Sequence, residues 1–123
     1  MNCGYPKEEK LKSRNAIDEL FRSGKSVSIY PLRLVYRKSS DEREKLQFGV
    51  SVSKRNFKKA VDRNYIKRVL REAYRLNKSG LDGASAFDFM LIYQTKERIP
   101  FDELKSKTRE LFEKFASKEL NTK

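Results

Sequence analysis

The sequence predicts an α+β sandwich with elements in the order α-β-β-β-α-β-α, in which helices pack against one mixed four-stranded sheet. Three observations predict it. Apolar residues recur at helical spacing near the start, in the middle and near the end of the chain. Residues 46–53 alternate apolar with small polar side chains, as a strand does. Residues 86–95 are almost continuously apolar, which is typical of a central strand covered on both faces.

Length and composition limit the class of protein. The 123 residues suit one domain over 1–123, with a polar lead over 1–12 and a tail over 121–123. Eight Phe and six Tyr argue against a disordered basic tail, although the net charge is +12. The lone Cys3 excludes a disulfide framework and suits a reducing cytoplasm. We expect no membrane partner, since no apolar run is long enough to span a bilayer and no signal-peptide pattern begins the chain.

The first elements follow from caps and turns. Ser13 is a plausible N-cap for a helix over residues 14–23, and Gly24 is placed to end it. Pro31 separates strands over residues 26–30 and 32–38. In the second strand, alternation puts Leu32, Leu34 and Tyr36 on one face and Arg33, Val35 and Arg37 on the other.

The third strand indicates what the sheet faces do. Phe48, Val50 and Val52 alternate with Gly49, Ser51 and Ser53, so one face is apolar and the other small and polar. We expect a sheet buried on one side and open on the other. The open face is either an ordinary solvated surface or a shallow floor for an extended strand. A last helix over residues 101–120 has the apolar stripe Leu104, Leu111, Phe112 and Phe115.

The chain is organised around the basic stretch over residues 53–78, whose second half reads as one helix. On a helical wheel one arc holds the apolar side chains Tyr65, Ile66, Val69, Leu70, Ala73 and Leu76. The opposite arc holds Lys59, Arg63, Asn64, Lys67, Arg68, Arg71 and Arg75. Residues 54–78 carry ten Lys or Arg against Asp62 and Glu72, a net +8.

A nearly single-signed helix face favours a polyanionic partner. Solvated faces usually mix signs, and like charges four residues apart repel each other. The row from Arg63 to Arg75 spans roughly 18 Å at about 1.5 Å per residue, which matches several backbone phosphates of RNA or DNA. Asp62, near the start of the helix, is explained by capping or by the helix dipole.

This stretch resembles the signature of the bacterial ribonuclease P protein component. In that family a strand ending in Val-Ser-Lys leads through a basic loop to Ala-Val-x-Arg-Asn-Arg-x-Lys-Arg-x-x-Arg. This chain has Val52-Ser53-Lys54, then Ala60-Val61-Asp62-Arg63-Asn64-Tyr65-Ile66-Lys67-Arg68-Val69-Leu70-Arg71. Tyr65 stands where the second arginine is expected, and the loop over 55–59 lacks the usual glycine and is one residue longer. The likeness is specific over residues 50–75 and extends by element order over about 11–120.

The resemblance implies a fold of the ribosomal protein S5 domain 2-like class, with a left-handed βαβ crossover over residues 46–95 in place of the usual right-handed one. It implies a protein subunit of ribonuclease P, an endoribonuclease that removes the 5′ leader of precursor tRNA. The implied partners are ribonuclease P RNA and precursor tRNA, and no small-molecule substrate. Catalysis is then expected from the RNA subunit, which holds most of the Mg2+. A metal site on the protein stays unknown.

Two sets of site residues follow. The resemblance implies that the RNA subunit is contacted by Lys54, Arg55, Lys58, Lys59, Arg63, Asn64, Lys67, Arg68, Arg71 and Arg75. Face parity together with the resemblance suggests a cleft for the 5′ leader made of Ile17, Phe21, Arg33, Val35, Ser51 and Ile92. For Ile17 and Phe21, core packing is an equal alternative to stacking on a base. Tyr65 either stacks on a base or completes the edge of the core, and the core edge is favoured.

The residues do not favour a self-sufficient nuclease. The chain has no His to activate a nucleophile and no phosphate-binding glycine loop. No spacing singles out the acids Asp62, Glu72, Asp82 and Asp88 as a metal cluster. The rival function is a ribosomal or general RNA-binding module without a role in tRNA processing. A DNA-binding helix is third, because it needs base-reading side chains and usually a dimer.

Overall fold

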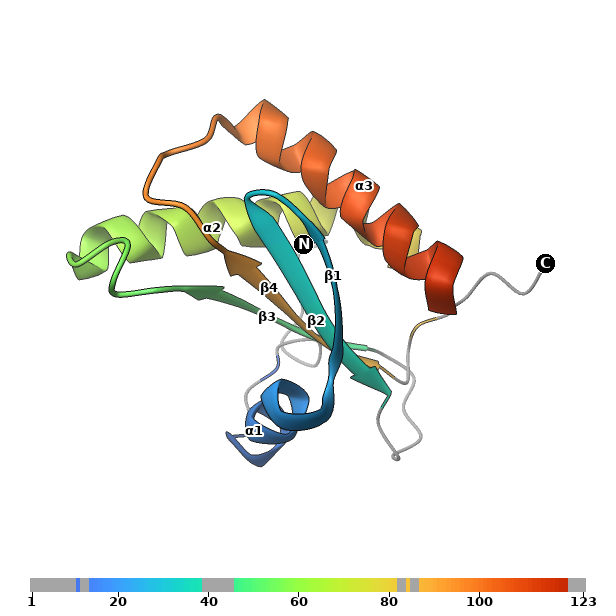
Figure 1. Ribbon diagram of the computed structural model, residues 1–123. Helices are drawn as coiled ribbons and strands as arrows, with labels where there is room; N and C mark the ends of the chain where they lie inside the picture. The colour runs from blue at the N-terminus through green and yellow to red at the C-terminus, as the bar shows by residue number, and fades with distance from the viewer. Residues whose placement is uncertain (1–10, 12–13, 39–45, 82–83, 85–86, 120–123) are drawn as a thin grey trace, which may run out of the picture.

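The computed structural model describes residues 11, 14–38, 46–81, 84 and 87–119. Its elements are α1 (Arg14–Ser23), β1 (Lys25–Ile29), β2 (Leu32–Lys38), β3 (Gln47–Val52), α2 (Ala60–Asn77), the 3₁₀ helix η2 (Lys78–Leu81), β4 (Phe87–Tyr93) and α3 (Phe101–Glu119) (Figure 1). The predicted order is confirmed. The predicted cap Ser13, the acid Asp82, the tail and all of the lead except Leu11 lie outside the described residues.

The four strands form one mixed sheet in the order β1-β2-β4-β3. β1 and β4 both pair antiparallel with β2, and β3 pairs parallel with β4. β4 is therefore central, as its apolar run predicted. The parallel pair needs a crossover, and α2 provides it. The left-handed sense of this crossover stays a prediction.

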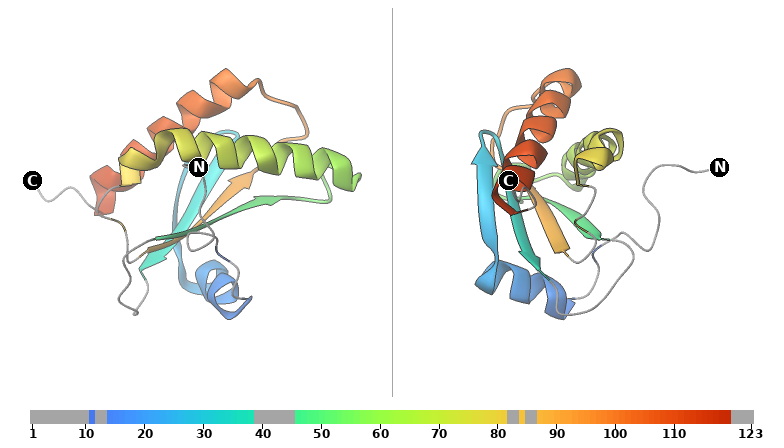
Figure 2. Two further views of the ribbon diagram at one scale, coloured as in Figure 1. Left: turned by 180° about the vertical axis from the view of Figure 1, so that it is seen from behind. Right: turned by 90° about the vertical axis from the view of Figure 1, so that its right-hand side faces the viewer.

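One face of the sheet carries the main core. α2 and α3 lie side by side over it (Figures 1 and 2). Aromatic rings fill the space between the helices and the sheet. Phe48 of β3 stacks on Tyr74 of α2 with ring centroids 4.0 Å apart, and Phe115 of α3 meets Phe89 of β4 edge-on at 5.0 Å. Such pairs add to the free energy of burying the rings.

The other face is open only in part, which corrects the prediction of one open face. α1 lies beneath it (Figure 1) and contacts β2 and β4. Leu20 of α1 and Leu11 form a second, smaller core with Val35 and Met90, all at most 8% exposed. Alternation along the strands showed which side chains share this face, but not that α1 returns to cover part of it.

Two glycines allow close approaches of the chain. A Cβ on Gly24 would lie 2.4 Å from the carbonyl oxygen of Leu20 and 2.9 Å from that of Tyr36. The Gly24 N–H donates to the Leu20 carbonyl at 2.9 Å, which ends α1. Gly24 is thus required because the carbonyl oxygens of Leu20 in α1 and Tyr36 in β2 are both near, and not for left-handed backbone angles. A Cβ on Gly49 would meet the Met90 Cε at 3.1 Å, so this position lets the smaller core close.

Candidate nucleic-acid interface

α2 positions the basic side chains by burying one face. Ile66, Leu70, Ala73 and Tyr74 are at most 1% exposed. The sequence placed Tyr65 and Leu76 on this face, but they are 44% and 43% exposed. The buried arc is rotated because the Tyr74 ring packs on Phe48, a contact that only the assembled sheet provides. The prediction that Tyr65 completes the core edge was therefore wrong.

Seven predicted basic residues lie on the loop before α2 or on α2 itself, half-exposed or exposed, and within the described residues none has a carboxylate partner. These seven cations are Lys54, Arg55, Lys58, Lys59, Lys67, Arg68 and Arg71. Asn64 is exposed beside them. Lys67 and Arg71 are one helical turn apart on one face. The arrangement offers uncompensated positive charge to a chain of phosphates.

Two other predicted contacts are used inside the protein. Arg63 is half-buried, and its Nη1 donates to the carbonyl oxygens of Phe57 and Lys58, both at 2.9 Å. Arg75 forms an ion pair with Glu72, and its hydrogen bond lowers the pKa of that carboxyl. Each of the two side chains already has an acceptor within the protein.

The basic loop has a fixed shape. The Ser53 carbonyl accepts the N–H groups of Asn56 and Phe57, at 3.2 and 3.1 Å. Phe57 is 7% exposed, and its ring lies 5.9 Å from that of Tyr93 in the main core. Phe57 and the Arg63 side chain thus anchor the loop at its centre. Sequence reasoning missed this anchor, whose signal was a lone aromatic residue in a run of cations.

Asp62 does not cap α2. The N-cap residue is Lys59, which makes no side-chain cap hydrogen bond. Asp62 lies in the first turn, where a negative charge complements the helix dipole. Its Oδ1 also accepts a hydrogen bond from Arg98 Nη2 at 2.5 Å. The expectation of a dipole role is consistent with this position, and the capping alternative is wrong.

Three predicted cleft residues form a row on the α1 face of the sheet. Ile92 of β4 is paired with Arg33 of β2 on one side and with Ser51 of β3 on the other. Arg33 is exposed, while Ser51 and Ile92 are half-buried. The row lies two residues along the strands from Val35 and Met90, which belong to the smaller core with Leu20.

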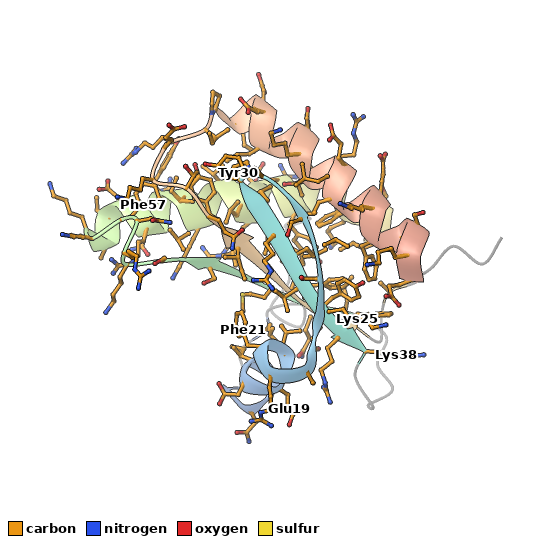
Figure 3. The ribbon with its side chains drawn as sticks, in the orientation of Figure 1. Glu19, Phe21, Lys25, Tyr30, Lys38 and Phe57 are labelled. Atoms are coloured by element: carbon orange, nitrogen blue, oxygen red, sulfur yellow. The ribbon has the colours of Figure 1, made fainter. Side chains whose placement is uncertain are left out.

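α1 borders this row. Phe21 is 51% exposed and lies on the side of α1 that faces the sheet, whereas Glu19 lies on the far side (Figure 3). Ile17 is partly buried against the smaller core, so core packing is part of its role. Val35 is 4% exposed and does not line a cleft, which corrects the prediction. The five remaining residues of the predicted leader cleft, which stays a prediction and is named the sheet cleft below, are Ile17, Phe21, Arg33, Ser51 and Ile92.

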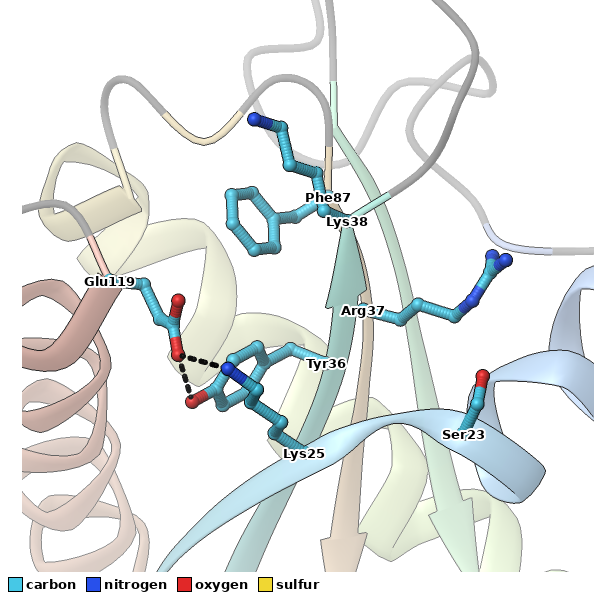
Figure 4. A pocket seen from close by; sticks show the side chains of 7 residues that line it. All are labelled: Ser23, Lys25, Tyr36, Arg37, Lys38, Phe87 and Glu119. Carbon is cyan, nitrogen blue, oxygen red and sulfur yellow. Dashed lines mark hydrogen bonds and ion pairs between the residues drawn. The ribbon is translucent and has the colours of Figure 1, made fainter.

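A pocket of about 260 Å³ lies elsewhere, where the end of β2 meets the end of α3 (Figure 4). Residues of the sheet cleft do not line it. Its carboxylate, Glu119, accepts the Tyr36 hydroxyl at 2.9 Å and pairs with Lys25 at 3.7 Å. Burial and this hydrogen bond raise the pKa of Tyr36 to about 12. At this pocket Glu119 therefore ties α3 to β2 through Tyr36 and to β1 through Lys25, and these three side chains already have partners.

The described carboxylates do not converge. Asp62 faces Arg98, Glu72 faces Arg75, and Asp88 is buried in β4. No group of three or more His, Cys, Asp or Glu side chains suited to a metal ion is found in the described part of the chain. Among the described helices, none combines the length and the apolar character needed to cross a membrane.

Comparisons with known proteins point to one family. A protein-family model described as Ribonuclease P matches residues 5–116. The ribonuclease P protein component of Porphyromonas gingivalis is 49% identical over 76 residues, 61% of this chain and 56% of that protein. The one from Dictyoglomus turgidum is 40% identical over 74 residues, 60% of each chain. The matched segments thus span about three fifths of these curated relatives.

A solved structure agrees with the sequence matches. The ribonuclease P protein from Thermotoga maritima superposes with a TM-score of 0.73 at 28% identity, covering 86% of this chain and 96% of that one. The mixed sheet and its helices are thus shared with that protein. The family model covers nearly the whole chain, and the chain therefore belongs to the Ribonuclease P family.

Proposed function

We propose that this chain is the protein subunit of ribonuclease P and aids removal of the 5′ leader from precursor tRNA in the cytoplasm. One observation carries the proposal: seven cations without a carboxylate partner in the described residues line α2 and its loop, in a chain of this family. The surface suits an RNA backbone better than a small molecule, because its charges are spread along a helix.

The proposed mechanism is electrostatic. A catalytic RNA and its precursor tRNA are both polyanions and repel each other at low ionic strength. The seven cations bind one RNA and offset part of that repulsion. The anchored loop and the helix hold them in place before binding, which reduces the entropy lost on association. In this proposal the RNA subunit supplies the catalytic groups and the Mg2+.

The sheet cleft has the properties needed to hold a single-stranded leader. Phe21 offers an exposed ring for stacking, Arg33 a cation for a phosphate, and Ser51 a hydroxyl for a hydrogen bond. These contacts do not read a base sequence, which suits leaders of varied sequence. The cleft and the cations of α2 would then hold substrate and catalytic RNA on one small protein.

The test is a cleavage assay at low Mg2+, with a bacterial catalytic RNA and a 5′-extended precursor tRNA. We expect the full chain to restore accurate removal of the leader and to cut nothing by itself. Raising Mg2+ should reduce the stimulation, because the added cations offset the same repulsion. Binding of both RNAs without stimulation at any Mg2+ concentration would instead favour the ribosomal-type RNA-binding module.

A further inference from the structure

The loop between β4 and α3 is held by hydrogen bonds on both sides of Arg98. The Tyr93 hydroxyl donates to the Glu97 carbonyl and accepts the Ile99 N–H at 3.0 Å. Thr95 is 7% exposed, and its Oγ1 accepts the Glu97 N–H at 3.2 Å. One hydroxyl from the core thus fixes the residues before and after Arg98.

Arg98 lies against Tyr65 of α2. Its guanidinium carbon is 5.1 Å from the centroid of the Tyr65 ring, and its Nη2 is 2.5 Å from Asp62 Oδ1. The Arg98 side chain is 54% exposed and Tyr65 is 44% exposed. Tyr65 precedes Arg68 by three residues, so the pair borders the seven cations. Two flat groups are therefore held together, with much of their surface in water.

The charge of Arg98 is already compensated by Asp62, so its attraction for a phosphate is small. Its planar face and the tyrosine ring keep their capacity to stack, which does not depend on net charge. We propose that the Tyr65–Arg98 pair is a stacking platform for one unpaired nucleobase of a bound RNA. This inference rests on the proposed function and adds a base contact to its phosphate contacts.

The experiment measures binding of the full chain to two probes over a range of salt: a bacterial catalytic RNA, and a precursor tRNA with a single-stranded 5′ leader. Arg98→Ala, Arg98→Lys and Tyr65→Ala should each weaken binding to one probe about tenfold. For Arg98→Lys and Tyr65→Ala, which keep the charge of the protein, the dependence of log K on log salt should stay as in the wild type. Arg98→Lys is decisive because it keeps the charge and loses the plane.

Three variants serve as references. Tyr65→Phe keeps the ring and should bind like the wild type. Arg109→Ala removes an exposed cation of α3 and should also leave binding unchanged. Lys67→Ala removes a proposed phosphate contact and should lower the salt slope by about 0.7–0.9. Thermal melts of each variant verify folding, which these exposed positions are expected to preserve.

The probe that loses affinity identifies the source of the base, either the catalytic RNA or the leader. The inference is overturned if Arg98→Lys binds both probes like the wild type, or if Tyr65→Ala, which removes no charge, lowers the salt slope as Lys67→Ala does. It is also overturned if Lys67→Ala weakens binding while neither Arg98 nor Tyr65 variants do. If Lys67→Ala and the platform variants all bind like the wild type, the proposed function itself fails.

Discussion

Arg71 and Arg75 are one turn apart on the same face of α2, yet their surroundings differ. Arg71 is exposed and has no carboxylate partner in the described residues, whereas Arg75 is ion-paired with Glu72. A cation that is already paired with a carboxylate neutralises less phosphate charge, so its contact releases fewer counterions from the RNA. We therefore expect Arg71→Ala to reduce the salt dependence of RNA binding more than Arg75→Ala does.

The magnitude follows from the count of unpaired cations. If all seven contact phosphates, log K should fall with log salt at a slope of about −5 to −6. Arg71→Ala should reduce the size of that slope by about 0.7–0.9. Between about 50 and about 200 mM salt, the wild type should then lose about threefold more affinity than Arg71→Ala. The change for Arg75→Ala should be about half as large or smaller.

Filter binding or fluorescence anisotropy with the catalytic RNA, at five or more salt concentrations, measures both slopes. Equal reductions for Arg71→Ala and Arg75→Ala would refute the argument that the Glu72 ion pair matters. An unchanged slope for Arg71→Ala would place that side chain away from the RNA. Arg109→Ala, on the outer face of α3, controls for the loss of one positive charge anywhere on the protein.

Three further predictions concern other surfaces. Phe21→Ala should change the free energy of unfolding by at most about 0.5 kcal/mol while weakening binding of a 5′-extended precursor more than of mature tRNA, whereas Leu20→Ala should destabilise by about 2–5 kcal/mol in denaturant unfolding. An equal loss of affinity for both RNAs in Phe21→Ala, relative to the wild type, would remove Phe21 from the sheet cleft. The pKa of Tyr36 is raised from 10.0 to about 12, so its protonated form stabilises the fold below pH 10.0 and this contribution is lost between pH 10.0 and about 12. The stability difference between wild type and Tyr36→Phe should accordingly shrink over that range, and a constant difference would contradict the assignment. Asp62→Asn should leave the Arg98 charge uncompensated and steepen the salt slope of RNA binding, and a slope equal to that of the wild type would show that the ion pair does not matter there.

Alternation and helical spacing were enough to predict the α-helices and the first three strands, and the continuous apolar run of residues 86–95 predicted the central place of β4. These patterns are local, and they are reliable here because every strand of the sheet buries at least one face. The same logic failed for Val35, which alternation assigned to the open face of the sheet. Its burial depends on α1 and Leu11 returning to the sheet, a contact between distant segments that no local pattern contains.

The sequence predicted which residues form the basic surface, but it did not predict what each of these side chains contacts. Charge and spacing identified Arg63 and Arg75, yet the carbonyls that bind Arg63 come from the loop before the helix, and Arg75 turns toward Glu72. Tyr65 was assigned to the core because a wheel drawn on α2 alone cannot include Arg98, which approaches from 33 positions further along the chain. Partners distant in sequence decided these roles.

The smaller core beneath the sheet has a consequence for local unfolding. Among the described residues the smaller core has four buried side chains, of which Leu20 belongs to α1, while the main core links α2, α3 and all four strands. We expect the amide hydrogens of α1 to exchange with solvent through openings of lower free energy than those of β4. Local unfolding of α1, which borders the sheet cleft, would then leave the rest of the fold intact. A leader bound across the cleft should slow that exchange.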